Sequence, residues 1–514
     1  MAPLFLKKVP QYCWGRVWGF EMRVVIAYQK DSQTLMAKMR GKWCCFYDYC
    51  VPRRRLLSMK SIACLRKMIT WISFYKEKPD LWLLMDRNTQ ADDNAEHLYR
   101  YIRRCYPRRR VKFVLSQSSC HWARLREEGF DLIPYGGRIH RACIWKASKL
   151  ISSHGGMNIS DAWQQTKQNP FVDFVFLDHG VIKNDMSRSY RRGHGVVLSD
   201  GRRKMDLLVT AAKDEFLSVA CSQSPYSLFP FQIKMTGFAR HDALLETAKK
   251  KASQRVVIIM PTWRRNASSW DCCYLPMSKQ RKERFLSSNY FSFWRSFLVS
   301  SKLKDLLLQY DYSAIFFPHA NSAPFLAYWG VPRYITCMTM ADCMEGIQKV
   351  LATGSLLITD YSSIAFDMAY IKKPVLYYQF DETEYSLVHY RKGYFDYLRD
   401  GFGPVARTEE SLLTCLEYLL LKGCRPEQQY LQRMESAFPF RDGQCCERIY
   451  QSICDLDKPR SPNDFDRRLL ITYAENAELR GEINLARKYW LRLLFHENGD
   501  LFALRDNFCR LLLS

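Results

Sequence analysis

Short apolar runs alternate with segments of helical spacing along most of this chain. In the first half, runs that predict buried strands lie at Leu81–Met85, Val111–Leu115, Leu132–Pro134 and Phe171–Leu177. Helical patterns occupy the segments between them, including one around His140–Leu150. Strands that alternate with helices predict a parallel sheet with helices on both faces.

The same alternation begins again after the basic segment Lys249–Lys251. The strands expected there are Arg255–Met260, Ala314–Phe317, Tyr334–Thr336, Leu356–Thr359 and Val375–Tyr378. We interpret the break near residue 245 as the boundary between two doubly wound halves. The expected domains are an N-terminal extension (1–75), a first Rossmann-like domain (76–245), a second one (246–456) and a helical tail (465–514), with a proline-containing linker at 457–464.

The two ends of the chain depart from this alternation. Residues 1–75 mix aromatic, basic and cysteine residues without a clear period, apart from one expected strand at Arg23–Ala27. Residues 465–514 have apolar positions at helical spacing around a glycine turn, which is similar to one tetratricopeptide-type hairpin. A helical cap that docks on the main body explains this pattern equally well.

The segment Leu356–Asp367 contains the strongest candidate for a ligand site. Its apolar start predicts a buried strand, and Asp360, Ser362 and Ser363 are residue types that begin helices. A strand that turns directly into a helix leaves backbone N–H groups free. Together with the helix dipole and two serine hydroxyls, these groups suit a phosphate. The alternative is a helix cap that binds no ligand.

Polar residues also follow four other expected strands, at the edge of a parallel sheet where ligands bind. They are Asp178–Asp185 with His179, Pro261–Arg264 with Thr262, Pro318–His319, and Gln379–Asp381 followed by Glu384. A single histidine after a strand is usually structural. Two histidines, an arginine and a serine pair at five strand ends favour a common site.

The composition is that of a large globular protein with a strong excess of positive charge. The 514 residues are 47% hydrophobic and carry a net charge of +25, with basic clusters such as Arg53–Arg55 and Arg108–Arg110. A field of this sign favours nucleic acid, an anionic membrane leaflet or phosphate-rich substrates. No nucleic-acid-binding motif is recognisable, so we expect no nucleic-acid partner.

The sequence also predicts where the protein is found. No apolar run approaches the roughly 18 residues of a membrane span. The apolar segment within Met1–Lys8 is too short for a secretory signal, and the expected compartment is the cytoplasm.

Several of these segments resemble the CDP-glycerol glycerophosphotransferases, which build poly(glycerol phosphate) in teichoic acids and related capsular polymers. The resemblance covers residues 80–450, and its most specific motif is Thr359–Ser363. The other matching segments are Asp86–Arg87, Asp92–Glu96, His179–Gly180 with Lys183 and Asp185, Pro261–Arg264, Pro318–His319, Tyr378–Asp381 with Tyr385, Arg391–Tyr394 with Asp396, Gly403–Pro404 and Phe438–Gly443. The resemblance implies an α/β, GT-B-like fold: two Rossmann-like, doubly wound domains that face each other across a cleft.

The resemblance also implies a reaction, in which an acceptor hydroxyl attacks the glycerol-bearing phosphorus of CDP-glycerol and CMP leaves. We expect His179 to act as general base, because an attacking alcohol must lose a proton and imidazole is suited to accept it near neutral pH. Charge neutralisation at the diphosphate is expected from His319, Arg264 and Arg391. The donor is expected to bind at Thr262, Ser362 and Ser363, with Asp360 fixing their loop and Asp367 fixing the helix. Ribose or glycerol hydroxyls are expected to contact Asp381 and Glu384, and the acceptor is expected to be oriented by Gly180, Lys183 and Asp185. A supporting role fits Lys183 and Asp185 equally well.

One departure from the family pattern leaves the substrates open. Teichoic acid polymerases of this family carry Trp before the histidine and Thr-Pro-Leu-Lys after it, whereas this chain has Asp178 before His179 and a different run after it. That pattern resembles a subgroup found in capsule and surface-polysaccharide clusters. The expected acceptor is a lipid-linked glycan or a polyol phosphate. A same-fold transferase that uses CDP-ribitol or a nucleotide sugar is the alternative, and a basic nucleic-acid-binding or scaffold protein is a remote one.

We expect neither a metal nor another cofactor. No Cys-x-x-Cys pair occurs, and the adjacent cysteines do not fit a zinc framework. Arginine, histidine and a helix start can take the place of a divalent cation beside a diphosphate. We also expect the basic clusters of residues 50–110 to hold the enzyme as a peripheral protein on the anionic inner face of the cell membrane.

Overall fold

The computed structural model describes residues 80–155 and 172–457, apart from short gaps at 188–189, 191–195, 198–202, 222–223, 227, 229, 269–276 and 344–345, and the backbone of residues 11–17 and 20–26. The chain divides into two compact units, Met1–Lys78 and Pro79–Ser514. In the first unit, β1 (Gln11–Val17) and β2 (Phe20–Ile26) form an antiparallel pair, and β2 confirms the strand expected near Arg23–Ala27. The predicted helical hairpin at 465–514 and the cluster Arg53–Arg55 lie outside the described residues.

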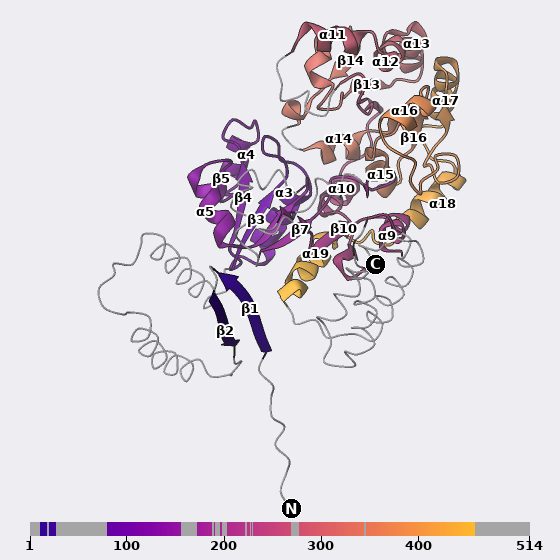
Figure 1. The fold of residues 1–514 in the computed structure, drawn as a ribbon. Coiled ribbons are helices and arrows are strands. Elements are labelled where there is room, and N and C mark those ends of the chain that lie inside the picture. Colours follow the sequence, from indigo (N-terminus) through magenta and orange to yellow (C-terminus); the bar gives the residue numbers. More distant parts are fainter. Residues whose placement is uncertain are drawn as a thin grey trace, which may run out of the picture. The chain divides into compact units, whose positions relative to one another are not determined.

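The first lobe of the second unit, residues 80–235, is built on a seven-stranded parallel sheet (Figure 1). Its strand order is β11-β10-β7-β6-β3-β4-β5, so the chain runs from β3 to one edge and then, through β6, to the other. This is a doubly wound sheet with its switch point between β3 and β6. The strands are β3 (Leu81–Met85), β4 (Val111–Leu115), β5 (Leu132–Pro134), β6 (Ala147–Ser152), β7 (Asp173–Phe176), β10 (Leu207–Thr210) and β11 (Ile233–Met235), beside a small antiparallel pair of β8 (Val196–Val197) and β9 (Arg203–Lys204).

The second lobe, residues 256–437, repeats this plan with a six-stranded parallel sheet. Its order is β14-β13-β12-β15-β16-β17, and its switch point lies between β12 and β15. The strands are β12 (Val256–Ile259), β13 (Ser313–Phe316), β14 (Ile335–Cys337), β15 (Leu356–Thr359), β16 (Val375–Tyr378) and β17 (Val405–Ala406). The two doubly wound halves that the sequence predicts are therefore confirmed.

Helices connect the strands of both sheets, as expected for parallel pairing. In the first lobe and the connection after it they are α3 (Asn94–Cys105), α4 (Trp122–Glu127), α5 (Arg138–Lys146), α9 (Lys213–Ala220) and α10 (Ala239–Lys250). Later in the chain they are α11 (Lys279–Leu286), α12 (Asn289–Val299), α13 (Ser301–Gln309), α14 (Ile347–Thr353), α15 (Ile364–Tyr370), α16 (Glu382–Val388), α17 (Glu409–Leu421), α18 (Gln428–Ala437) and α19 (Cys445–Cys454). Short 3₁₀ turns cover Pro230–Gln232, Ala323–Tyr328, Met340–Asp342 and Asp455–Asp457.

Alternate residues of the same strand enter different hydrophobic clusters. In β3, Trp82 and Leu84 enter one buried cluster and Leu83 enters another. In β15, Leu357 joins the first of these clusters and Leu356 enters a third. Because both faces of these strands are buried, they read as continuous apolar runs in the sequence. The cluster that contains both Trp82 and Leu357 joins the two lobes through a shared core.

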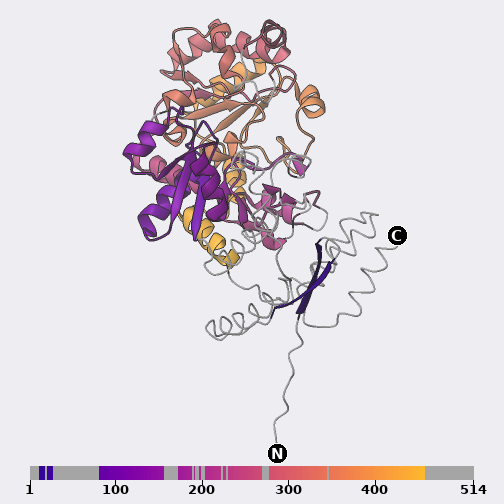
Figure 2. The same ribbon diagram turned by 60° about the vertical axis from the view of Figure 1, so that its left-hand side comes forward.

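Two details differ from the sequence-based expectations. The helix predicted around His140–Leu150 is wrong beyond Lys146, because residues 147–152 form the central strand β6 between β3 and β7. The helix α10 runs without a break across the boundary predicted near residue 245. In addition, α19 (yellow in Figures 1 and 2) packs on α3 and α10, so the end of the predicted second domain returns to the first lobe.

Candidate functional site

The switch points of the two sheets bring polar side chains to the strand ends. In the first lobe, Arg87 follows β3 and His154 follows β6, and Arg87 Nε lies 3.2 Å from His154 Nε2. In the second lobe, Thr262 and Arg264 follow β12, and Asp360 follows β15. Because ligands bind at the switch points of open parallel sheets, these four strand ends define the candidate site.

His179 lies on the loop after β7, beside the first-lobe switch point. Its imidazole is 44% exposed and its Nδ1 lies 3.2 Å from Asp178 Oδ1. The ring stacks on that of His154, with 4.3 Å between centroids. Asp178 itself is buried, and the Tyr190 hydroxyl donates to its second carboxylate oxygen. The histidine expected to act as a base is thus held on two sides and open to solvent on another.

The His179 loop contacts the second lobe directly. A β-carbon on Gly180 would come within 2.9 Å of the Ser363 Cβ. The buried ammonium group of Lys183 donates to the Tyr361 carbonyl over 2.6 Å. Two residues on, the Asp185 N–H donates to the Arg391 carbonyl over 3.1 Å. The structure therefore brings the residues predicted for the acceptor side against those predicted for the donor side.

The expected role of Asp360 as the residue that fixes its loop agrees with its contacts. Asp360 is fully buried, and its Oδ1 accepts from the Thr262 N–H at 2.8 Å and the Tyr361 N–H at 2.6 Å. The loop leads directly into α15, whose N-cap is Ser363. The Ser363 side chain makes no capping hydrogen bond, and the Ser362 hydroxyl accepts from the Ile364 N–H at 3.4 Å. The turn thus has the strand-to-helix form predicted from the sequence.

Arg264 and Asp381, both expected to contact the donor, bind each other in the structure. Arg264 is 3% exposed, and its Nε and Nη2 donate to Asp381 at 2.7 and 3.1 Å. The same Nη2 donates to Asp360 at 2.8 Å, while Nη1 donates to the Thr262 carbonyl at 2.7 Å. The guanidinium also lies 4.9 Å from the Tyr361 ring centroid. With its donors engaged in this way, Arg264 joins the loops after β12, β15 and β16 and is a positioning residue.

Two histidines of the second lobe are held in the neutral form. Burial lowers the pKa of His319 to about 3, with smaller contributions from Arg87 and His179. Its Nδ1 accepts from the Asn321 N–H at 3.1 Å, so the proton of the neutral ring is on Nε2. Burial likewise lowers the pKa of His389 to about 2. His319 is therefore a neutral ring that can donate a hydrogen bond from Nε2.

The remaining predicted site residues, Arg391 and Glu384, are less buried than Arg264 and Asp360. Arg391 is exposed, next to a segment that packs against the first-lobe loop: a β-carbon on Gly393 would meet backbone atoms of Asn184 within 2.8 Å. Glu384 is partly buried and accepts from the Asn266 amide. It lines a hollow of about 350 Å³ together with Phe293 and Arg407.

A buried arginine ties the candidate site to both lobes. Arg240, on α10, donates to Asp367 of α15 at 2.8 Å and to Asp93 at 2.8 Å. Its backbone N–H donates to the Asn94 side chain, which in turn donates to the Asp178 carbonyl at 2.7 Å. The motif Asp92–Glu96 therefore connects the His179 loop, through Asn94, to Arg240 and the helix that begins at Ser363.

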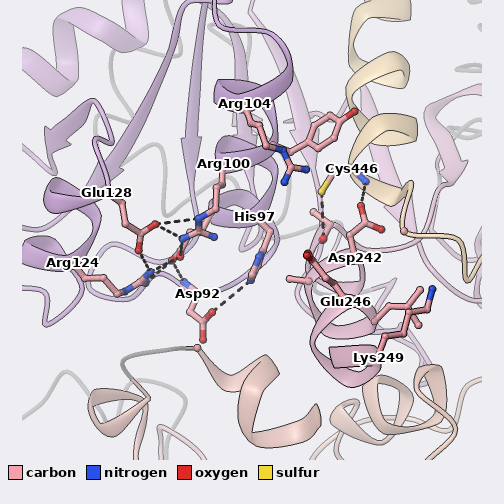
Figure 3. Close-up of a pocket in the computed structure, with 17 residues that line it drawn as sticks. Asp92, His97, Arg100, Arg104, Arg124, Glu128, Asp242, Glu246, Lys249 and Cys446 are labelled. Atoms are coloured by element: carbon pink, nitrogen blue, oxygen red, sulfur yellow. Dashed lines mark hydrogen bonds and ion pairs between the residues drawn. The ribbon is translucent and has the colours of Figure 1, made fainter. Parts of the chain in front are cut away.

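A second hollow, of about 740 Å³, lies between α3, α10 and α19 (Figure 3). None of the site residues predicted from the sequence lines it. Its carboxylates have partners within the protein: Glu96 binds Arg100 and Arg124, and Asp242 accepts from the backbone N–H groups that begin α19. These side chains join helices, and we assign no ligand to this hollow.

Several residues of the site escaped the sequence analysis. His154 and His389 both contact site residues: His154 stacks on His179, and His389 packs edge-on against Trp263 at 4.6 Å. The one available signal for His154 was its position two residues after the missed strand β6. The ion pair between Arg240 and Asp367 spans 127 positions and has no local sequence signal.

Across residues 80–155 and 172–457, every helix is too short or too polar to traverse a bilayer. In the same part of the chain, no three His, Cys, Asp or Glu side chains gather in a way that would hold a metal ion.

Two curated proteins of teichoic acid biosynthesis are similar to this chain in sequence. The minor teichoic acid biosynthesis protein GgaB of Bacillus subtilis (strain 168) is 30% identical over 422 residues, which cover 79% of this chain and 43% of that protein. The teichoic acid poly(ribitol-phosphate) polymerase of Bacillus spizizenii is 21% identical over 282 residues, covering 53% of this chain and 36% of that protein. The chain thus spans less than half the length of these two relatives.

Solved structures and a family model complete the comparison. The structure of the wall teichoic acid polymerase TagF, 16% identical, matches with a TM-score of 0.52 over 77% of this chain and 99% of that chain. Together with the two parallel sheets, this likeness establishes the predicted GT-B-like fold. The family model for CDP-glycerol:poly(glycerophosphate) glycerophosphotransferases matches residues 65–455. The chain therefore belongs to the CDP-glycerol:poly(glycerophosphate) glycerophosphotransferase family.

Proposed function

We propose that this chain transfers glycerol phosphate from CDP-glycerol to a hydroxyl group of a polyol-phosphate or lipid-linked glycan acceptor, releases CMP, and takes part in the synthesis of a cell-surface polymer. The observation that carries the proposal is the contact of Gly180 with Ser363. It sets the His179 loop of one lobe against the strand-to-helix turn of the other. Family membership supports the donor, and a TagF variant solved after a soak with CDPG matches this chain with a TM-score of 0.50.

His179 is the proposed general base. The acceptor oxygen forms a bond to the glycerol-bearing phosphorus as its proton passes to the imidazole, and the phosphoanhydride bond to CMP breaks. A step of this kind depends on positioning and charge neutralisation more than on covalent chemistry. The 44% exposure of the His179 side chain leaves it accessible to an acceptor. A positioned base contributes typically about 10²–10⁴-fold in rate.

The diphosphate is proposed to bind at the Asp360–Ser363 turn. The hydroxyls of Ser362 and Ser363 and the free N–H groups at the start of α15 provide donors. His319 adds the Nε2–H of its neutral ring, and Arg391 adds a positive charge from an exposed position. Arg264 stabilises the turn by donating a hydrogen bond to the Asp360 carboxylate. Glu384 remains the proposed contact for a ribose or glycerol hydroxyl.

A donor screen tests this function. The full chain is incubated with CDP-glycerol, CDP-ribitol or UDP-sugars and a glycerol-phosphate-terminated acceptor, and CMP or UDP release is measured. We expect CMP release from CDP-glycerol, and its loss by at least about 100-fold in His179→Ala. Release from UDP-sugars alone would overturn the proposal.

CDP-ribitol is the second candidate donor. It is favoured by the 21% identical poly(ribitol-phosphate) polymerase and by the departure at Asp178 from the polymerase pattern. Faster turnover of CDP-ribitol than of CDP-glycerol, at equal concentrations and with the same acceptor, would support this candidate.

The basic surface is proposed to bind an anionic inner leaflet, where a lipid-linked acceptor would lie. Arg108 and Arg110 are exposed, and each basic residue near such a surface contributes about 1 kcal/mol. We expect sedimentation with phosphatidylglycerol vesicles and not with phosphatidylcholine vesicles. Equal behaviour with both would remove this part of the proposal.

A further inference from the structure

Asp178 adopts a backbone conformation that residues other than glycine rarely adopt. Its φ is 54°, which lies in the left-handed region. Such a conformation costs free energy and persists where surrounding contacts impose it, most often at functional sites. Here the Asn94 amide fixes the Asp178 carbonyl at 2.7 Å. The His179 N–H fixes its side chain by donating to Oδ1 at 2.6 Å.

The strained backbone directs the Asp178 carboxylate at the imidazole of the next residue. Oδ1 lies 3.2 Å from His179 Nδ1, and the buried Tyr190 hydroxyl donates to Oδ2. Burial alone would raise the pKa of Asp178, but the hydrogen bonds from His179 and Tyr190 outweigh it, and the pKa lies below its usual value. The carboxylate is therefore ionised, and it can only accept hydrogen bonds.

We propose that Asp178 is a positioning residue that keeps the proton of neutral His179 on Nδ1 and leaves Nε2 free to take the acceptor proton, and that Tyr190 holds Asp178 in place. This inference rests on the proposed function of His179 as general base. When the acceptor oxygen bonds to phosphorus and CMP leaves, the acceptor proton forms an Nε2–H bond. The resulting imidazolium is then stabilised by the Asp178 carboxylate until Nε2 releases the proton to solvent.

The other charged groups around His179 come from three elements. His154, two residues after β6, stacks on the ring, and its Nε2 lies 3.3 Å from the Asp93 carboxylate. Arg87, after β3, has its Nε 3.2 Å from His154 Nε2. His319, in the second lobe, interacts electrostatically with His179. Asp178 is the carboxylate in direct contact with the His179 ring among the described residues. Replacing the Asp178 carboxylate should therefore change the electrostatic environment of the His179 ring more than any other single substitution.

The test uses the full chain with Asp178→Asn and Tyr190→Phe. Asparagine suits the test because it tolerates the left-handed region and differs only in charge and one donor group. The tautomer of His179 is read by ¹⁵N NMR of histidine-labelled protein, with the signals assigned through His179→Gln. We expect the Nδ1–H tautomer in the unmodified chain and a shift toward Nε2–H in Asp178→Asn. With CDP-glycerol as donor, we expect kcat to fall by about 10²–10⁴-fold and the acid limb of the kcat/KM profile to move to lower pH.

Tyr226→Phe provides a matched control. Tyr226 packs edge-on against Tyr190 at 5.1 Å, but its hydroxyl donates to the Asn184 carbonyl rather than to Asp178. We expect Tyr190→Phe to lower kcat about 10-fold and shift the tautomer partly, and Tyr226→Phe to leave the tautomer and the acid limb unchanged. An unchanged tautomer and pH profile in Asp178→Asn would overturn the inference. Absence of CDP-glycerol turnover with the tautomer shift intact would overturn only the proposed function.

Discussion

Gly180 of the first lobe lies against Ser363 of the second so closely that no side chain fits between them. A β-carbon on Gly180 would lie 2.9 Å from the Ser363 Cβ, a distance that real Cβ atoms essentially never show. The contact joins the loop that carries His179 to the turn that begins α15. The His179 loop and the Ser362–Ser363 turn, which carry the strongest chemical signals in the sequence, thus contact each other across the two lobes.

Gly180→Ala should lower turnover by at least about 10-fold, because the added methyl group forces the His179 loop away from Ser363 and misplacement near the chemistry is costly. Donor turnover and the free energy of unfolding are measured together. Gly137→Ala is the control, because its β-carbon would lie 3.7 Å from the Pro134 carbonyl, an ordinary contact. Full turnover in Gly180→Ala would show that the contact does not position the site.

The sequence predicted most of the buried strands but missed several, among them β10, β11 and the central first-lobe strand β6, which contains a buried charge. All five strands predicted in the second lobe are confirmed, because a strand buried on both faces reads as an apolar run. In β6 the run is interrupted by Lys149, which is 1% exposed and binds Asp173 at 2.6 Å and Asp457 at 2.7 Å. Those partners lie 24 and 308 positions away, so no local pattern reveals them. Missing β6 also hid His154, which follows it.

Lys183 should control the alkaline limb of the activity profile. Burial lowers its pKa to about 8, while Asp360 opposes the shift. As the ammonium loses its charge above this pH, its hold on the Tyr361 carbonyl weakens and kcat/KM should fall. Lys183→Arg keeps its charge and should move the alkaline limb to higher pH. Lys373, whose pKa burial also lowers to about 8, lies elsewhere, so Lys373→Arg should leave the limb in place.

The same shift predicts the sign of a stability effect. The pKa of Lys183 is lower in the folded chain than its usual value of about 10.4 in the unfolded chain. Between about pH 8 and 10.4 the unfolded chain therefore binds more protons, and the Lys183 contribution to the free energy of unfolding rises with pH. Lys183→Met should lack this rise when unfolding by urea is followed across that window. An identical pH dependence in the variant would contradict the assignment.

Arg264 should stabilise the ligand-free protein. Arg264→Met leaves Asp360 and Asp381 buried without their cation, and breaking such a buried pair costs about 3–5 kcal/mol. Equilibrium unfolding by urea without donor measures the loss. Arg407→Met removes a half-exposed pair with Glu382 and should cost about 0–1 kcal/mol. If Arg264 served only to bind the donor, ligand-free stability would not change.

The sequence could identify Arg264, Asp360 and Asp381 as members of one site but not their partners. Each follows a predicted strand, which placed them at the same sheet edge. Whether an arginine at such an edge faces a ligand or a carboxylate depends on side-chain contacts between loops. Arg264 and Asp381 are 117 positions apart, and their pairing was visible only in the structure.

Turnover should persist in the presence of a chelator. Arg391, the Nε2–H of His319 and the N–H groups at the start of α15 together offer the charge neutralisation that a diphosphate needs. CMP release from CDP-glycerol in excess EDTA should match that in added Mg²⁺. Abolition by EDTA with recovery on adding Mg²⁺ would show that a divalent cation takes part.

Arg240 should couple the stability of the two lobes to pH. Burial would raise the pKa of Asp367, but the Arg240 charge outweighs it and holds the pKa well below its usual value. In the unmodified chain, the stabilisation from Asp367 is therefore present above about pH 4, the usual pKa of an unfolded aspartate, and is lost as the pH falls through the lowered pKa. Arg240→Met removes the largest cause of the lowering, although His241 still faces the carboxylate, and the loss of the buried pair should cost about 3–5 kcal/mol at pH 7.

That penalty should shrink as the pH falls from 7 to 5, because the unpaired Asp367 carboxyl becomes protonated at a higher pH than before. Adding Asp367→Asn to Arg240→Met removes one of the two unpaired carboxylates, and we expect it to recover part of the loss at pH 7 and little at pH 5. Urea unfolding of the single and double variants at both pH values measures this. Two results would contradict this account: a loss of stability that is independent of pH, or a double variant no more stable than Arg240→Met. Either would show that Arg240 stabilises the contact between the lobes through packing alone, without a contribution from the charge of Asp367.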